Sequence, residues 1–167
     1  MTSRTLVIMR HAKAEQSETL PDIRRALTAR GREDARAAGA WLAAEQLAPD
    51  VVLCSPSIRT RGTWHEVAIG LAEGDATVSP TVQYEESLYA AGVNAMLDLV
   101  RELPDDAHIA LVIGHNPTVS ALSMRLDEDA ARAEPGLKTA GIAVHDVTDE
   151  WASVAAADLT RAYTARG

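Results

Sequence analysis

The stretch Thr5-Leu6-Val7-Ile8-Met9-Arg10-His11 decides the fold, because it joins a short apolar run to two polar side chains. An apolar run of roughly 4–8 residues is typical of a strand that is buried on both faces of a sheet. Two further runs of this kind, Val51–Cys54 and Ile109–Ile113, follow later in the chain. Each run is followed by a polar segment and then by a helical pattern, so strands and helices alternate along the chain.

Four helices are predicted from apolar residues that recur at helical spacing, over Arg32–Gln46, Ser57–Leu71, Val93–Leu103 and Thr118–Leu126. Thr28 is expected to cap the first of them, since its hydroxyl can accept a hydrogen bond from a free backbone N–H. Weaker patterns predict an edge strand near Thr77–Gln83, an acidic surface loop over Asp127–Pro135 and, in the tail, a hairpin around Thr148–Glu150.

This alternation predicts an α/β fold, because strands separated by helices form a largely parallel sheet with helices on both faces. We expect a three-layer α/β/α sandwich around a mostly parallel central sheet, with residues 1–167 forming one domain. In such sheets, ligands bind beyond the carboxyl ends of the strands. The order of the strands does not follow from the sequence.

Composition and charge limit the classes of function. The chain has 167 residues, 47% of them hydrophobic, and one cysteine, Cys54, so we expect a core that needs no disulfide or metal. The formal net charge of −8 and an aromatic content of 4% argue against nucleic-acid binding. No apolar run reaches the roughly 18 residues of a membrane span. Without a secretory signal, we expect a cytoplasmic protein.

Basic side chains follow the carboxyl ends of the three strands. The first strand ends at Arg10 and His11, and the third ends just before His115. The second leads within one helical turn to Arg59. Because these ends meet at one edge of the sheet, we expect the four side chains to converge. Guanidinium groups grip phosphate oxygens, and a neutral imidazole nitrogen can attack phosphorus. The pattern therefore predicts a phosphoryl-transfer site without a metal or other cofactor.

The residues around these ends form four motifs: Leu6-Val7-Ile8-Met9-Arg10-His11-Ala12, Leu27-Thr28-x-x-Gly31, Cys54-Ser55-Pro56-x-x-Arg59-x-x-x-Thr63 and Val112-Ile113-Gly114-His115-Asn116-Pro117. Together they resemble the histidine phosphatase superfamily, whose fold is phosphoglycerate mutase-like. The short chain and the opening Arg10-His11-Ala12-Lys13-Ala14-Glu15 are similar to the SixA type, the small phosphohistidine phosphatases. The resemblance extends from Leu6 to about Leu122, and the tail matches in outline.

The resemblance implies a role for each converging residue. His11 would be the nucleophile that becomes phosphorylated. Arg10 and Arg59 would hold the phosphoryl oxygens, and His115 would stabilise the transferred group. Besides Arg10, Arg59 and His115, the residues expected to contact the substrate are Lys13, Glu86 and Asn116.

A proton donor for the leaving group is the least defined part of this site. In larger relatives a carboxylic acid protonates the leaving alcohol, and the candidates here, Glu85 and Glu86, fit no clean motif. Imidazole leaves phosphorus more easily than an alkoxide, so an enzyme without a well-placed acid should prefer phosphohistidine or activated esters over alkyl phosphates. We therefore expect a phosphatase that acts through a covalent phosphohistidine, takes phosphohistidine on a protein as substrate and releases inorganic phosphate.

Other functions stay open on the same scaffold, namely a phosphatase for small phosphomonoesters and a phosphate-binding module without catalysis. A cysteine phosphatase would place its nucleophile at Cys54. That class needs five residues between the cysteine and the arginine, whereas Ser-Pro-Ser-Ile separates Cys54 from Arg59, and Pro56 removes a needed N–H. The remaining histidines are expected to be structural or solvated: His65, His108 and His145.

Overall fold

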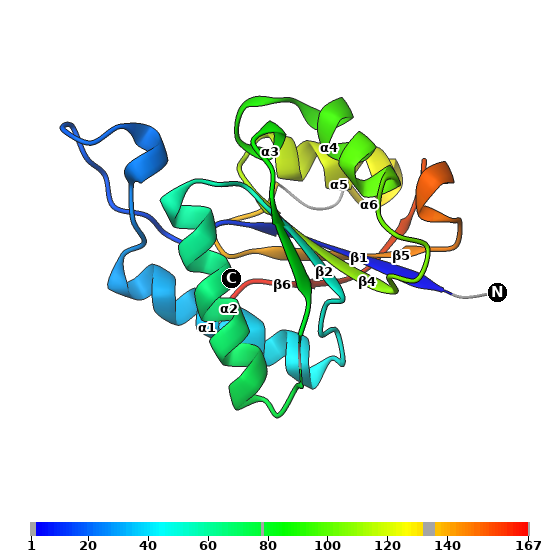
Figure 1. The fold of residues 1–167 in the computed structure, drawn as a ribbon, viewed down its shortest axis with the longest axis horizontal. Helices are drawn as coiled ribbons and strands as arrows, with labels where there is room; N and C mark the ends of the chain where they lie inside the picture. Colours follow the sequence, from blue (N-terminus) through cyan, green and yellow to red (C-terminus); the bar gives the residue numbers. More distant parts are fainter. Residues whose placement is uncertain (1–2, 78, 132–135, 167) are drawn as a thin grey trace.

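A six-stranded sheet forms the centre of the computed structural model, which describes residues 3–77, 79–131 and 136–166 (Figure 1). The strand order is β3-β2-β4-β1-β5-β6. The strands are β1 Arg4–Arg10, β2 Val51–Cys54, β3 Thr81–Tyr84, β4 Ile109–Gly114, β5 Ile142–Val147 and β6 Asp158–Tyr163. The pairs among β3, β2, β4 and β1 are parallel, whereas β5 is antiparallel to both β1 and β6. The predicted mostly parallel sheet is therefore confirmed.

Helices cover both faces of this sheet and complete the predicted three layers (Figure 1). One face carries α1 Ala29–Ala44 and α2 Ile58–Glu73, and the other carries α4 Val93–Arg101 and α5 Thr118–Leu126. The shorter elements are α3 Ser87–Ala90, α6 Glu128–Ala131, and the 3-10 turns η1 Asp22–Arg24 and η2 Trp151–Ser153. Within the described ranges, no helix combines the length and the hydropathy needed to cross a membrane.

Most of the predicted elements are confirmed, with differences at their ends. The bounds of β2 and α5 are those predicted, and the Thr28 hydroxyl caps α1 by accepting a hydrogen bond from the Gly31 N–H at 2.9 Å. β3 begins only after Pro80, because proline has no N–H to give to a neighbouring strand. The predicted hairpin in the tail is the β5–β6 pair.

The predicted acidic loop over Asp127–Pro135 is wrong in its first part, where residues 128–131 form α6. One oxygen of the Asp127 carboxylate accepts the Ala130 N–H at 3.0 Å, and the other accepts the Leu159 N–H at 2.8 Å. Asp127 thus supplies the side-chain acceptor that starts this short helix and ties it to β6. The last part of the predicted loop, residues 132–135, lies outside the described residues.

The side chains of β1 alternate between two cores. Leu6 and Ile8 belong to the core under α4 and α5, whereas Val7 and Met9 belong to the core under α1 and α2. All four are fully buried, and burial of such a side chain contributes roughly 1.5–3 kcal/mol. The strand is therefore held from both faces, and it carries the Arg10-His11 pair at its carboxyl end.

Candidate active site

The register of the parallel strands brings the carboxyl ends of β1, β2 and β4 to one level. The His11 N–H donates to the Gly114 carbonyl at 3.0 Å, and the Ser55 N–H donates to the Ile113 carbonyl at 3.1 Å. His115 follows Gly114 directly. Side chains from three separate segments therefore leave the sheet next to one another, at the edge where α/β sheets bind ligands.

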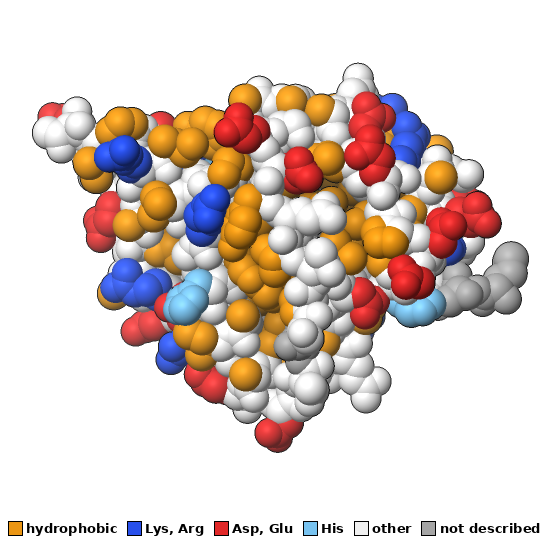
Figure 2. All heavy atoms as spheres, viewed as in Figure 1, with side chains coloured by type: hydrophobic (Ala, Val, Ile, Leu, Met, Phe, Trp, Pro, Cys, Tyr) orange, Lys and Arg blue, Asp and Glu red, His pale blue; other side chains and the backbone are white. Residues whose placement is uncertain are grey.

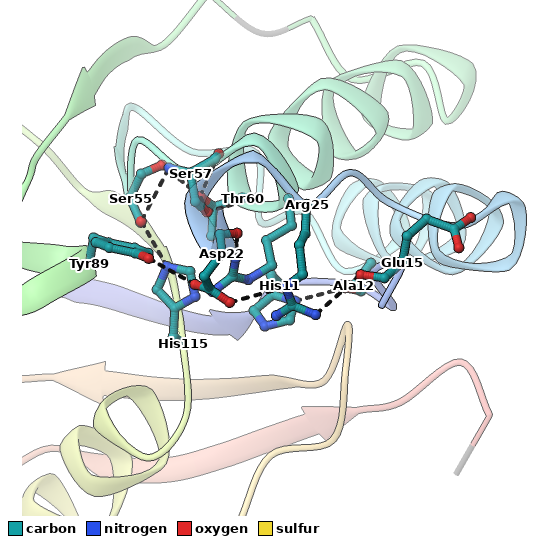
Figure 3. Close-up of polar contacts among 11 residues, drawn as sticks. His11, Ala12, Glu15, Asp22, Arg25, Ser55, Ser57, Thr60, Tyr89 and His115 are labelled. Carbon is teal, nitrogen blue, oxygen red and sulfur yellow. Dashed lines mark hydrogen bonds and ion pairs between the residues drawn. The ribbon is translucent and has the colours of Figure 1, made fainter. Parts of the chain in front are cut away.

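Two imidazole rings lie next to each other at this edge, tilted by 52° (Figure 3). The ring centroids of His11 and His115 are 5.3 Å apart. Nε2 of His115 lies 2.7 Å from the Ser55 hydroxyl, and the Tyr89 ring stands edge-on to His115 with centroids 5.4 Å apart. The structure thus brings together the two histidines that the sequence places far apart.

A hydrogen bond fixes the position of the proton on the His11 ring. Nδ1 lies 2.8 Å from the Ala12 carbonyl oxygen. Because a carbonyl oxygen can only accept a hydrogen bond, Nδ1 carries the hydrogen. The neutral ring therefore has its lone pair on Nε2. Burial, together with the charges of Arg59 and Arg10, lowers the pKa of His11 to about 4. At neutral pH, His11 therefore offers an unprotonated Nε2, which is the form that can attack phosphorus.

The segment after His11 is held by contacts with both helices of the neighbouring layer. The Ala12 N–H donates to the Thr63 hydroxyl at 3.0 Å, and that hydroxyl donates to the Arg59 carbonyl at 2.7 Å. A Cβ on Gly31 would lie 2.1 Å from the Lys13 carbonyl oxygen, so only glycine lets α1 approach this closely. These contacts fix the backbone whose carbonyl orients the His11 ring.

Arg59 is buried and is bound to Asp22. Its guanidinium donates to the Asp22 carbonyl at 2.8 Å and to Oδ2 of the Asp22 carboxylate at 2.9 Å. The Tyr89 hydroxyl donates to the same Oδ2 at 2.8 Å. The hydrogen bonds from Tyr89 and Arg59, with the charge of Arg25 adding to them, lower the pKa of Asp22 to about 2. The Asp22 carboxylate is therefore ionised at neutral pH.

His115 and Arg10 also lie in this partly desolvated site. Burial, followed by the charge of Arg59, lowers the pKa of His115 to about 3, so its ring is neutral at pH 7. Burial also lowers the pKa of Arg10, whose Nη1 donates to the Leu137 carbonyl at 3.3 Å. Both rings and both guanidiniums of the predicted constellation thus belong to the carboxyl-end edge of the sheet.

Unpaired buried nitrogens gather at this edge. Within the described part of the chain, four buried side-chain nitrogens lack a hydrogen-bond partner, and three of them are Arg10 Nε, Arg59 Nε and His115 Nδ1. An unpaired buried donor costs about 1–3 kcal/mol. A phosphoryl group has several oxygens, which can accept hydrogen bonds from guanidinium donors of the kind that Arg10 and Arg59 leave unpaired here.

The other predicted contact residues lie differently. Lys13 is exposed and lines a neighbouring cavity that includes Arg10. Glu86 is exposed just before α3. The Asn116 amide donates to the Leu137 carbonyl at 2.8 Å, and its oxygen accepts from the Ser120 hydroxyl, so the protein itself uses this side chain. Contact of these three with a substrate stays a prediction.

Sequence reasoning did not identify Asp22, Tyr89, Arg25 and Ser55 as residues of the site. Asp22 and Arg25 form an ion pair at 3.0 Å within the loop between β1 and α1. Aspartate and arginine are ordinary in an exposed loop, so no pattern marks them. A cue was available for Ser55, since it directly follows β2 as His11 follows β1.

A cysteine nucleophile does not fit this structure. Cys54 is buried at the end of β2, and burial raises the pKa of its thiol to about 12, so the thiolate form is absent at neutral pH. The remaining histidines are solvated or structural, as predicted. His65 and His108 are exposed, and His145 is buried between the Ser123 hydroxyl at 2.7 Å and the Ala157 carbonyl at 2.9 Å. Within the described ranges, no three His, Cys, Asp or Glu residues are grouped so that they could hold a metal ion.

Comparison with known proteins assigns this chain to a family. The sequence pattern of the histidine phosphatase superfamily (branch 1) matches residues 6–88. An uncharacterised protein of Mycobacterium tuberculosis is 38% identical over 153 residues, which cover 87% of this chain and 91% of that protein.

Solved structures agree with the family assignment. A protein of Nakamurella multipartitia, assigned as a phosphohistidine phosphatase of the SixA type, superposes with a TM-score of 0.82 at 35% identity over 98% of this chain and 96% of that one. The structure of the protein histidine phosphatase SixA with tungstate has the same fold, with a TM-score of 0.79 at 23% identity over 96% of both chains. The chain therefore has the phosphoglycerate mutase-like fold and belongs to the histidine phosphatase superfamily, within it to the SixA type.

Proposed function

We propose that this phosphatase removes the phosphoryl group from phosphohistidine on a protein, through a covalent phosphohistidine on Nε2 of His11. The observation that carries the proposal is the pair of hydrogen bonds that the Asp22 carboxylate accepts in the site, from the Arg59 guanidinium and the Tyr89 hydroxyl. Asp22 has a pKa of about 2, so at neutral pH it can accept a hydrogen bond but cannot donate a proton. A leaving alkoxide needs such a proton, whereas a leaving imidazole does not.

We propose no such acid at Glu85 or Glu86. Glu86 is exposed, and neither side chain forms a hydrogen bond or an ion pair with any described residue. Asp22 suits a different leaving group, because a phosphohistidine protonated on its second ring nitrogen presents an N–H. An ionised carboxylate near the phosphoryl position would accept that N–H and favour the protonated form. The charge of Asp22 thus favours imidazole over alcohol as the leaving group.

In the first step, Nε2 of His11 forms a bond to phosphorus while the bond from phosphorus to the substrate nitrogen breaks. The electron pair of the broken bond stays with the leaving ring, which departs as neutral imidazole because its second nitrogen already carries a proton. His11 keeps the hydrogen on Nδ1, held by the Ala12 carbonyl, and becomes the new phosphorylated imidazolium. Arg10, Arg59 and His115 would donate to the phosphoryl oxygens during the transfer.

In the second step, the oxygen of a water molecule forms a bond to phosphorus and the bond to Nε2 of His11 breaks. The electron pair returns to Nε2, and inorganic phosphate leaves with both hydrogens of the water. The ring is then neutral again, with its proton on Nδ1. The two steps have the same form, since each breaks a bond between phosphorus and a protonated imidazole.

Turnover of matched substrates tests this proposal. The wild-type protein is given a histidine-phosphorylated protein, a phosphoserine peptide and an aryl phosphate, and phosphate release is measured. We expect the histidine-phosphorylated protein to be hydrolysed and phosphoserine to be hydrolysed far more slowly. Equal or faster hydrolysis of phosphoserine would contradict the proposal and favour a phosphomonoesterase.

Trapping the intermediate tests the nucleophile. After rapid acid-free quenching, we expect one labelled phosphate that is labile to acid and stable to base, located at His11 by peptide mapping. The His11→Asn variant should carry no label. Tight phosphate binding without any release or labelling would instead indicate a binding module.

A further inference from the structure

A cavity of about 380 Å³ has Arg10, one of the active-site residues, in its lining. We refer to it as the basic hollow, because its lining includes five cationic residues and a single acidic one: Arg10, Lys13, Arg30, Lys138, Arg166 and Asp34. These residues come from the end of β1, the start of α1, the segment before β5 and the chain after β6. Segments far apart in the sequence thus form one cationic concavity beside the site.

The basic hollow contrasts with the charge of the rest of the molecule. The chain has a formal net charge of −8, and Figure 2 shows Asp and Glu side chains scattered over the face in view. Against this background, a local excess of cations is not what a random distribution of charges would give. Clefts lined by charges of one sign concentrate ligands of the opposite sign.

Asp34 orients two of the cations. It is buried, and its carboxylate binds the Arg166 guanidinium at 2.8 Å and lies 3.9 Å from the Arg30 guanidinium. The Glu33 carboxylate also lies 3.5 Å from the Arg166 guanidinium, so two carboxylates face the five cations of the basic hollow. The ammonium groups of Lys13 and Lys138 form no hydrogen bond or ion pair with any described residue, and both side chains are exposed. The basic hollow therefore holds positive charge that the protein itself leaves uncompensated.

We infer that the basic hollow binds acidic side chains that flank the phosphorylated histidine of the protein substrate. The inference rests on the proposed function. Arg10 joins the two sites, so a molecule whose phosphoryl group reaches His11 brings its neighbouring groups to the basic hollow. Several exposed cations, separated from one another, match several carboxylates on a protein surface better than one compact anion.

Charge reversal at Lys138 tests this inference. Two phosphohistidine peptides are compared, one with Glu and Asp flanking the phosphorylated residue and one with Ser and Ala, together with an aryl phosphate. Reversal removes an attraction and adds a repulsion, so we expect Lys138→Glu to raise KM for the acidic peptide about 5–10-fold with kcat unchanged. KM for the neutral peptide and for the aryl phosphate should change less than about 2-fold.

Arg125→Glu is the matched control. It makes the same change in net charge, but Arg125 is exposed near the end of α5, bonds to Asn94 and does not line the basic hollow. This variant should leave KM of all three substrates unchanged. Arg30→Glu should repeat the effect of Lys138→Glu, and thermal melting checks that each variant folds. Equal KM values for the acidic peptide in wild type and Lys138→Glu would overturn the inference.

A second pair of substrates separates this inference from the proposed function. If the wild-type protein cleaves aryl phosphates but no phosphohistidine, the proposed function fails. Phosphotyrosine peptides flanked either by Glu and Asp or by Ser and Ala then test the basic hollow. A preference for acidic flanks that Lys138→Glu removes would support the inference. A dependence on Lys138 seen only with a small bisphosphate would overturn it and indicate a small-molecule ligand.

Discussion

The Asp22 carboxylate lies 2.9 Å from the Arg59 guanidinium, so the arginine expected to hold the phosphoryl group is already bound to an anion of the protein itself. The Asp22 carbonyl accepts a second hydrogen bond from the same guanidinium, at 2.8 Å. An incoming phosphoryl group must therefore share Arg59 with Asp22 or displace it. The like charge of Asp22 would weaken the binding of a phosphate dianion and hasten its release as product.

Removing this carboxylate should strengthen product binding. In Asp22→Ala, Arg59 loses its competing anion, so we expect inorganic phosphate to inhibit the variant several-fold more strongly than the wild type. The inhibition constant, measured with an aryl phosphate as substrate, checks this. Asp106→Ala makes the same change in charge at an exposed position before β4, at the opposite end of the strand, and should not alter the constant. Weaker inhibition of Asp22→Ala would show that Asp22 helps to hold phosphate.

The His11 ring should titrate far below the usual range of histidine. Burial and the nearby arginines lower its pKa to about 4, so the ring stays neutral from pH 7 down to about pH 5 and gains a proton as the pH falls through 4. Nε2 then loses its lone pair, and the nucleophile is lost. NMR titration of the ring in the free protein should give a midpoint near pH 4. A midpoint near 6.5 for His11 would contradict this electrostatic account.

His115 is expected to act on the transition state. Its ring lies 5.3 Å from that of His11 and has one buried nitrogen, Nδ1, without a partner. In His115→Ala, the loss of a donor to the transferred oxygens should lower kcat about 10²–10³-fold, with a smaller change in KM. Steady-state kinetics on an aryl phosphate measures the effects on kcat and on KM separately. An effect confined to KM would indicate that His115 only binds the substrate. His145→Gln removes a buried histidine that lies on β5 and bonds to Ser123 and Ala157, and it tests whether loss of any buried histidine has the same result.

Replacing the only cysteine should leave the chemistry intact. The Cys54 thiol is buried, donates to the Ser55 carbonyl at 3.3 Å and has a pKa raised to about 12. A serine hydroxyl can make the same hydrogen bond, so Cys54→Ser should keep kcat/KM within about 3-fold of wild type. Treatment of the native protein with a thiol reagent should likewise leave activity unchanged. Loss of labelling at His11 in Cys54→Ser would revive a cysteine nucleophile.

A methyl group at Gly31 should disturb both stability and catalysis. The added Cβ would lie 2.1 Å from the Lys13 carbonyl oxygen, which forces α1 and the segment after His11 apart. We expect Gly31→Ala to lower the free energy of unfolding by about 1–3 kcal/mol and also to lower kcat. Gly92→Ala is the control, because a Cβ there would meet nothing within 4 Å. Denaturant unfolding and kinetics compare the free energy of unfolding and kcat of the two variants. Wild-type values of both in Gly31→Ala would contradict the close approach of α1 to Lys13.

The sequence by itself determined the layers of the fold and the centre of the site. Apolar runs such as Val51–Cys54 are continuous because a strand buried on both faces has no solvent side, and this pattern is local and readable. The motifs around His11, Arg59 and His115 could be placed at strand ends because each directly follows a predicted strand or its first helical turn. Parallel strands then required these ends to meet.

Only the tertiary structure decided how these groups are charged and oriented. The link from Asp22 to Arg59 and Tyr89 joins three segments with no shared periodicity, so no sequence pattern reveals it. The low pKa of His11 and the lone pair on its Nε2 depend on burial and on one backbone carbonyl, both of which exist only once the chain has folded. Electrostatic shifts and hydrogen-bond geometry depend on distances of a few ångströms between side chains, whereas sequence periodicity reports only which face of an element is buried.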